Sequence, residues 1–420
     1  MGCFIKSSFV IVICFIKFIK KMKSVSSFSH VIGGALIVAG TSIGAGMLAL
    51  PVVTSITGFY PSIFVYLICW LVMTSTGLLY LEVAVRIPAD ANIISMASIF
   101  LGKKWKAVTW ILYLFLFYCL SVSYISGGGE IILNVLGLNI PQWLMTSIFV
   151  LFFGSVVYLG TNMVDRINFL LMVGLCVTFL FFVVMGIKQV NVSLLNYAKP
   201  SKAIWSLPVV LLSFGYQGVV PSLTYYLKKN IKQTRLAIIV GTTFVLLVYL
   251  LWEFLILGVV PIEGKYGLAN AKTAVAPLRY YLNVNTVHMI GDFFGFFAIT
   301  TSFLGISLGL FDFFSDGLKL KKKGKNKLFI FAFTFLPPLL VTLIYPDVFI
   351  EALQYAAVYG GIVLLIFLPT LLAWRERYVV KSISHKKILP GGKSVLIFLF
   401  CFSVLEFCFE VGKTIFSIFS

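Results

Sequence analysis

The stretch G-T-S-I-G-A-G-M-L-A-L-P at residues 40–51 decides the fold, and it lies inside the first long apolar run of the chain. Its first seven residues include three glycines and two hydroxyl side chains, so a regular helix is only weakly favoured there. A membrane helix tolerates such an interruption only where the freed backbone groups find partners or line a cavity. Close packing of two helices is the alternative, because Gly40 and Gly44 have the spacing of a small-residue contact.

The overall composition indicates a membrane protein. Apolar residues make up 60% of the 420 residues and charged residues only 11%, whereas soluble domains average about 45–50% and about 25%. A soluble enzyme and a disordered chain are therefore excluded, and a polytopic, all-α membrane protein remains. All seven cysteines lie in apolar runs and form no short-spaced pair, so we interpret them as small hydrophobic residues and predict no metal site.

A spanning helix needs about 20 apolar residues. Eleven runs are candidates: 30–57, 60–85, 107–133, 142–160, 167–187, 203–227, 236–260, 288–314, 328–345, 347–373 and 394–411. We expect a single membrane transport domain over residues 22–420, with two repeats (about 30–187 and about 203–373) and an extra helix (394–411). Residues 1–21 are an uncertain extension, interpreted either as an interfacial helix or as sequence that precedes a true start at Met22.

A second apolar run is interrupted in the same way as the first. It reads S-F-G-Y-Q-G-V-V-P-S-L at residues 213–223, with small and polar residues followed by a proline. This run is the sixth span, five spans after the first, so the second block of five enters the membrane from the opposite side. Paired interruptions in inverted halves are typical of the midplane binding site of a transporter.

The distribution of cations predicts the orientation. Lys and Arg favour cytoplasmic loops, and an internal N-terminus puts 26 of the 33 Lys and Arg residues inside and 7 outside. The C-terminus is then periplasmic. Because the loops account for the net charge of +19, no nucleic-acid partner is needed, and the lipid bilayer is the expected surrounding.

The chemistry of the two breaks favours a zwitterion as the ligand. The N–H groups of Gly44, Ala45 and Gly46 begin a new half-helix, whose positive end is a receptor for a carboxylate. The carbonyl groups that end the other half-helices can accept hydrogen bonds from an ammonium group: Thr41, Ser42, Ser213 and Phe214. A site with these two ends predicts an α-amino acid as substrate.

These residues carry a resemblance to a known family. The first break, the segment T-S-F-L-G-I-S-L-G-L-F-D-F at residues 301–313 and the count of eleven spans resemble the bacterial aromatic amino-acid permeases, in particular the tyrosine/tryptophan-specific permeases of chlamydial type. This family belongs to the amino-acid/polyamine/organocation superfamily, and the resemblance runs from about residue 29 to the end. It implies the leucine-transporter fold of five-plus-five inverted repeats, with helices 1 and 6 broken, and location in the bacterial inner membrane.

The same resemblance implies proton-driven symport and assigns further residues. It puts residues 40–47 and 213–218 at the two breaks and Tyr124 of the third span against the substrate. Three hydroxyl residues fall where sodium-coupled relatives hold an ion: Thr300, Thr301 and Ser302. Sodium coupling therefore stays open. Some proton-coupled relatives use a lysine in the fifth span, but residues 167–187 contain none.

Two acidic residues are candidates for carrying a proton, because ionisable groups inside spans are costly and often functional. Glu253 follows Trp252 and has apolar residues on both sides. Glu82 has Arg86 as its nearest charged neighbour in the sequence, so a structural salt bridge or helix cap is the alternative role. Thr301 and Ser302 complete the candidates for ion coupling.

The remaining predictions concern selectivity and class. Phe214, Tyr216 and Tyr124 form either an aromatic slot for the substrate or ordinary packing, and Gln217 is placed to orient the substrate. We predict an importer of tyrosine or tryptophan with no catalytic residue, no cofactor besides the coupling ion and no obligatory protein partner. A serine/threonine permease of the sister branch and a sodium-coupled amino-acid transporter are the alternatives.

Overall fold

The computed structural model describes residues 26–87, 92–137, 140–281, 285–380 and 387–419, and these residues form helices and no strand. The long or broken helices are α2 (Ser26–Ser42) with α3 (Gly46–Ser55), α4 (Phe59–Ala84), α6 (Lys103–Leu136), α7 (Gln142–Leu159), α8 (Thr161–Gly186), α10 (Leu207–Ser213) with α11 (Val220–Tyr226), α12 (Ile231–Val259), α14 (Asn285–Gly317), α15 (Gly324–Ile344), α16 (Phe349–Tyr355) with η5 (Ala356–Phe367) and α17 (Leu368–Tyr378), and α18 (Gly392–Phe419). Short helices occupy connections: α5 (Ile93–Leu101), η1 (Ile187–Gln189), α9 (Val192–Leu195), η2 (Pro200–Ser206), η3 (Gln217–Val219), η4 (Leu268–Asn270) and α13 (Leu278–Tyr281).

The predicted all-α polytopic architecture is confirmed. In the described part of the chain, ten helices are long and apolar enough to cross a membrane, and the bent pair of α2 and α3 raises the number to eleven. Each of the eleven predicted runs overlaps one of these spans. The division into two inverted repeats and one extra helix stays a prediction, and the interpretation of residues 1–21 falls outside the described residues.

Local sequence signals explain several helix ends. Asn92 caps α5, since its side chain accepts a hydrogen bond of 2.9 Å from the N–H of Ser95, and Asn230 caps α12 in the same way. Pro221 lies in the first turn of α11, where a helix needs no N–H from it. These helices therefore begin where the sequence has a polar cap or a proline.

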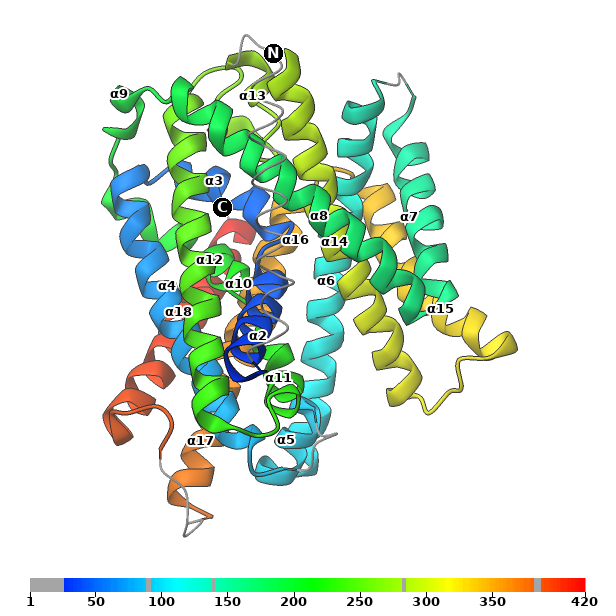
Figure 1. Ribbon diagram of the computed structural model, residues 1–420, viewed down its shortest axis with the longest axis vertical. Helices are drawn as coiled ribbons and strands as arrows, with labels where there is room; N and C mark the ends of the chain where they lie inside the picture. Colours follow the sequence, from blue (N-terminus) through cyan, green and yellow to red (C-terminus); the bar gives the residue numbers. More distant parts are fainter. Residues whose placement is uncertain (1–25, 88–91, 138–139, 282–284, 381–386, 420) are drawn as a thin grey trace.

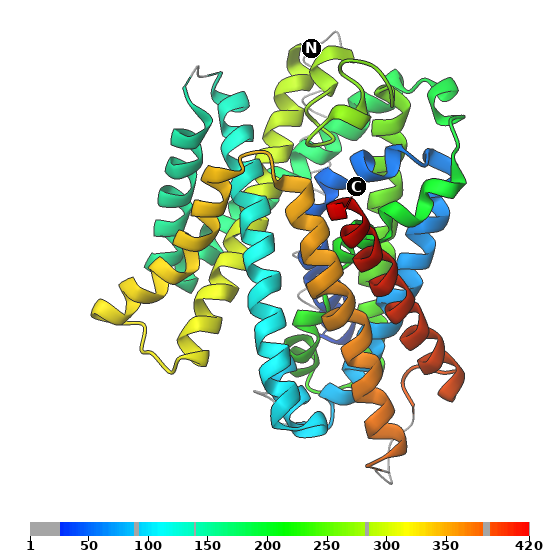
Figure 2. The same cartoon turned by 180° about the vertical axis from the view of Figure 1, so that it is seen from behind.

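The spans pack as two groups, which Figures 1 and 2 show from opposite sides. In one group α12 packs against α2 and α4, and in the other α14 packs against α6 and α8. The tenth span joins them, because α16 and η5 lie against α6 while α17 lies against α4; Figure 2 shows this orange span beside the cyan α6. The broken helices α2–α3 and α10–α11 therefore pack within the first group, against α12 and α4.

The outer surface is apolar, as a bilayer requires. On α8, Phe169 and Leu170 are each 68% exposed. The C-terminal ends of α4, α11, α14 and α17 lie toward the lower end of the molecule in Figure 1. The cation count predicts that this end is cytoplasmic, and that assignment stays a prediction.

Candidate functional site

The first predicted break is present between α2 and α3. Helix α2 ends at Ser42, α3 begins at Gly46, and the two helices meet at an angle of 59°. The hydroxyl groups of Thr41 and Ser42 donate to carbonyl groups one turn earlier in α2, a bond that competes with regular helical structure. The interruption that the glycine-rich sequence predicts is therefore present in the structure.

The second predicted break follows α10. Helix α10 ends at Ser213, residues 214–216 leave the helix, and η3 leads into α11. The side chain of Gln217 accepts a hydrogen bond of 3.0 Å from the N–H of Tyr216. It donates to Thr76 Oγ1 at 3.0 Å and to the carbonyl of Met73 at 3.3 Å. Gln217 therefore anchors this break to α4. The side-chain amide that we predict to orient the substrate is already engaged in these hydrogen bonds.

Both breaks line one cavity of about 670 Å³, within the range of about 300–1,000 Å³ typical of small-molecule sites. Its walls also come from α6, α8 and α14. Eleven of the fourteen predicted site residues line it: Thr41, Ser42, Gly44, Ala45, Gly46, Tyr124, Ser213, Tyr216, Gln217, Thr301 and Ser302. Phe214, Glu82 and Glu253 are not among its lining residues.

The backbone donors of the first break are partly engaged. The N–H of Ala45 donates to Ser302 Oγ at 2.9 Å, so α14 supports the break from the other helix group. Within the described residues, the N–H groups of Gly44 and Gly46 donate no hydrogen bond. These two groups are the free backbone donors at the beginning of α3.

Gly44 and Gly46 also lie close to side chains of neighbouring helices. A Cβ atom on Gly44 would lie 2.2 Å from Ser302 Oγ, and one on Gly46 would lie 2.9 Å from Ser213 Oγ.

Gly46→Val should therefore weaken binding of an amino acid by more than tenfold, or about 1.4 kcal/mol. Equilibrium binding of labelled tyrosine to purified protein measures this. The control is Gly412→Val in α18, where a Cβ meets no atom within 4 Å.

The carbonyl groups of Ser42 and Ser213 face a residue that the sequence analysis missed. The hydroxyl of Tyr249, on α12, lies 2.7 Å from the Ser42 oxygen and 2.8 Å from the Ser213 oxygen. The available signal was a tyrosine in the middle of an apolar span, because a buried phenol usually finds a hydrogen-bond partner. Sequence alone gives no indication of which partner that is.

The predicted aromatic slot is only partly on the cavity. Tyr124 and Tyr216 line the cavity, whereas Phe214 packs edge-on against Tyr249 and Tyr66, with ring centroids 5.1 Å and 6.4 Å away. The hydroxyl of Tyr216 donates to the carbonyl of Met73 at 3.2 Å. Phe214 therefore contributes to packing behind the break.

Glu253 is fully buried between three helices. Its Oε2 accepts a hydrogen bond of 2.9 Å from the hydroxyl of Tyr66 on α4, and its Oε1 contacts the hydroxyl of Thr54 on α3. The neighbouring Trp252 donates from Nε1 to the carbonyl of Met47 at 2.9 Å. Glu253 thus connects α12 to the half-helix that follows the first break.

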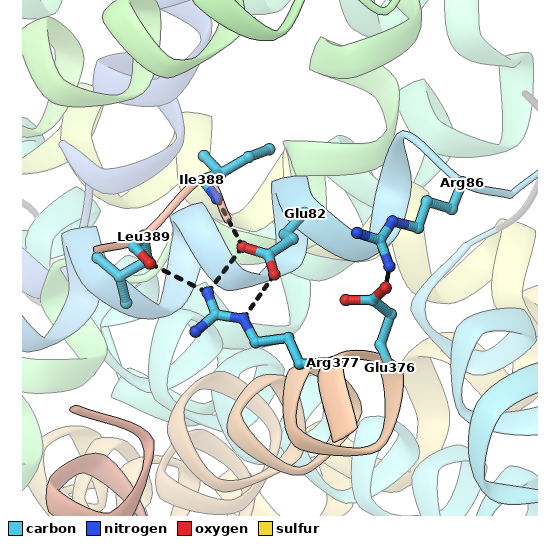
Figure 3. Close-up of polar contacts among 6 residues, drawn as sticks. All are labelled: Glu82, Arg86, Glu376, Arg377, Ile388 and Leu389. Atoms are coloured by element: carbon cyan, nitrogen blue, oxygen red, sulfur yellow. Dashed lines mark hydrogen bonds and ion pairs between the residues drawn. The ribbon is translucent and has the colours of Figure 1, made fainter. Parts of the chain in front are cut away.

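Glu82 belongs to a different arrangement, a pair of ionic contacts between α4 and α17 (Figure 3). Arg377 donates from Nε to Oε1 at 2.6 Å and from Nη2 to Oε2 at 2.8 Å. The N–H of Ile388 also donates to Oε2, at 2.8 Å. Arg86, the nearest charged neighbour in the sequence, pairs with Glu376 instead. These contacts favour the structural alternative for Glu82.

The hydroxyl groups on α14 differ in their contacts. Ser302 contacts the first break, whereas the Thr301 hydroxyl donates to the Phe297 carbonyl of its own helix at 2.8 Å. Thr300 Oγ1 is buried and has no hydrogen-bond partner among the described residues. Of the three, Ser302 therefore has the hydrogen bond to the first break, and their role in ion coupling stays a prediction.

Ten to eleven candidate spans among the described residues, two broken helices and a shared cavity define a multi-pass membrane protein. Comparison with known families gives its particular membership: the chain belongs to the tryptophan/tyrosine permease family, which matches residues 28–409. This confirms the resemblance stated from the sequence.

Individual relatives agree with this family. The chain is 32% identical to the tryptophan-specific transport protein of Haemophilus influenzae over 406 residues, covering 91% of this chain and 96% of the relative. It is 30% identical to the tyrosine-specific transport system 1 of the same organism, over 89% and 94% of the two chains. The low affinity tryptophan permease of Escherichia coli is also 30% identical, over 82% and 86%. The chain is thus similar to both tryptophan and tyrosine transport proteins.

Proposed function

We propose that the protein imports tyrosine or tryptophan across the bacterial inner membrane by symport with protons. The observation that carries this proposal is that both helix breaks line one cavity, in a chain of the tryptophan/tyrosine permease family. The carboxylate binds the free N–H groups of Gly44 and Gly46, and the ammonium binds near the carbonyl groups of Ser42 and Ser213. Tyr124 and Tyr216 contact the aromatic ring.

The shape of the cavity supports alternating access. The lining extends to Asn92 and Asp316, at the end of the molecule that the cation count predicts to be cytoplasmic. Toward the other end, the connection after α12 contacts α3, the half-helix that follows the first break, since the N–H of Ala274 donates to the carbonyl of Leu48 at 2.8 Å. This conformation corresponds to the inward-facing state, in which substrate leaves toward the cytoplasm.

Coupling to protons is assigned to Glu253 in preference to Glu82. Glu253 contacts only neutral groups, Thr54 and Tyr66, in the hydrogen bonds described above, and a carboxyl group in such a setting can exist in neutral or charged form. Glu82 is bound by the permanent charge of Arg377 through two parallel hydrogen bonds, an arrangement that suits a structural role. Sodium remains the alternative coupling ion. Ser302 falls where sodium-coupled relatives hold an ion, and it contacts the first break.

Uptake into proteoliposomes that contain only the purified chain tests the proposal. Labelled tyrosine, tryptophan, phenylalanine and serine are offered under a proton gradient or a sodium gradient. We expect accumulation of tyrosine or tryptophan with the proton gradient alone, without a protein partner. Preferred uptake of serine contradicts the substrate class, and uptake that needs the sodium gradient contradicts proton coupling.

The orientation is tested separately. A reporter domain fused to the C-terminus should be active in the periplasm, and one inserted at Lys323, between α14 and α15, should be active in the cytoplasm. Alkaline phosphatase and green fluorescent protein fusions report the two compartments. Activity of both insertions on one side of the membrane contradicts the predicted topology.

A further inference from the structure

Tyr249 contacts both helix breaks at once. It is fully buried on α12, and its hydroxyl oxygen lies within 2.8 Å of the carbonyl oxygens of Ser42 and Ser213. Ser42 is the last residue of α2 and Ser213 the last residue of α10. One phenol therefore joins the ends of two helices that belong to different halves of the chain.

The hydroxyl of Tyr249 and the carbonyl groups of Ser42 and Ser213 form a cluster with fewer protons than hydrogen-bond acceptors. The last carbonyl groups of a helix lack partners within the helix and carry partial negative charge. A phenol has a single proton, so Tyr249 can donate to only one of the two carbonyl groups at a time. The other carbonyl then faces an oxygen that has no proton for it, and the cluster can accept a further donor.

The position of the cluster shows from which side that donor can come. Ser42 and Ser213 line the cavity, whereas Tyr249 does not, so the phenol reaches the two carbonyl groups from the side away from the cavity. Its ring is held by edge-on contact with Phe214, at a centroid distance of 5.1 Å and an angle of 71°. A ligand in the cavity therefore meets Ser42 and Ser213 without meeting Tyr249.

We propose that Tyr249 is a positioning residue for the ammonium group of the substrate, an inference that rests on the proposed function. Its hydroxyl fixes the distance between the carbonyl groups of Ser42 and Ser213 from behind. A substrate ammonium in the cavity supplies the protons that the three oxygens lack. Tyr249 acts through the two backbone carbonyl groups and contacts no part of the carboxylate.

Tyr249→Phe tests this role, because it removes one oxygen and keeps the ring. The purified variant is titrated with labelled tryptophan and with indole-3-propionate as a displacing ligand, which keeps the ring and carboxylate and lacks the amine. We expect the Kd for tryptophan to rise more than tenfold and the inhibition constant of indole-3-propionate to change less than twofold. Loss of a merely structural contact would weaken both ligands equally.

Tyr80→Phe is the matched control. Tyr80 is fully buried, and its hydroxyl donates to a single backbone carbonyl at 2.6 Å, that of Leu364, which belongs to neither break. Unchanged tryptophan affinity in Tyr249→Phe overturns the inference. So does an equal loss for both ligands, or failure of Tyr249→Phe to insert where Tyr80→Phe inserts. A wild-type protein that binds neither tryptophan nor tyrosine contradicts the proposed function instead.

Discussion

Glu253→Gln is expected to abolish accumulation of tyrosine or tryptophan against a concentration gradient, while exchange of internal for external substrate continues. Exchange needs no net movement of protons, whereas accumulation does. Glutamine keeps the size of the side chain and its hydrogen-bonding capacity, but it cannot take up or release a proton near neutral pH. A change confined to accumulation therefore identifies a proton carrier.

The hydrogen bonds around Glu253 accommodate both protonation states. The hydroxyl of Thr54 has one proton and two acceptors within reach, the carbonyl of Leu50 at 2.7 Å and Oε1 of Glu253. When Glu253 is protonated it can donate to Thr54, which then donates to Leu50. When Glu253 is charged, Thr54 and Tyr66 can both donate to it. Proton transfer would thus shift one hydrogen bond along α3, the half-helix that follows the first break.

Proteoliposomes measure this prediction, with labelled tyrosine outside and either a proton gradient or unlabelled tyrosine inside. Glu263→Gln is the control, because Glu263 is an exposed carboxyl in the connection after α12. We expect the control to accumulate substrate as the wild type does. If Glu253→Gln also concentrates substrate under a proton gradient alone, Glu253 is not the carrier.

The two helix breaks were predictable because their signals are local. Glycine, hydroxyl residues and proline weaken a helix at their own positions, so residues 40–51 and 213–223 identify the interruptions without knowledge of the packing. The buried position of Glu253 was predictable for a similar reason, since apolar residues flank it on both sides. Each of these predictions depends only on residues that are neighbours in the sequence.

Side-chain partners were not predictable in the same way. The sequence suggested Arg86 as the partner of Glu82, but α17 lies against α4 and brings Arg377 to Glu82 from 295 residues away. Tyr249 reaches Ser42 across 207 residues. Phe214 lies at the second break but turns toward Tyr249, not the cavity. Such contacts depend on how helices pack, which apolar spans of nearly uniform composition leave unspecified.

Arg377→Met is expected to have the largest effect on stability, because it leaves the buried carboxylate of Glu82 without its hydrogen-bonded counter-charge. Glu82 and Arg377 have side chains only 1% and 3% exposed, and breaking one side of such a pair costs about 3–5 kcal/mol. An exposed pair contributes about 0–1 kcal/mol. Lys322→Met is therefore the control, since Lys322 and Asp312 form an exposed pair at 2.6 Å.

The double variant Glu82→Gln with Arg377→Met distinguishes an ion pair that holds α4 and α17 together from one that contributes no stability. Glutamine keeps an oxygen that can accept the N–H of Ile388 and removes the unpaired charge, so we expect the double variant to recover more than half of the lost stability. Thermal unfolding of the purified proteins in one detergent gives the comparison. Lys322→Met should unfold close to the wild type. A single Arg377→Met variant as stable as Lys322→Met would show that the buried pair does not hold α4 and α17 together.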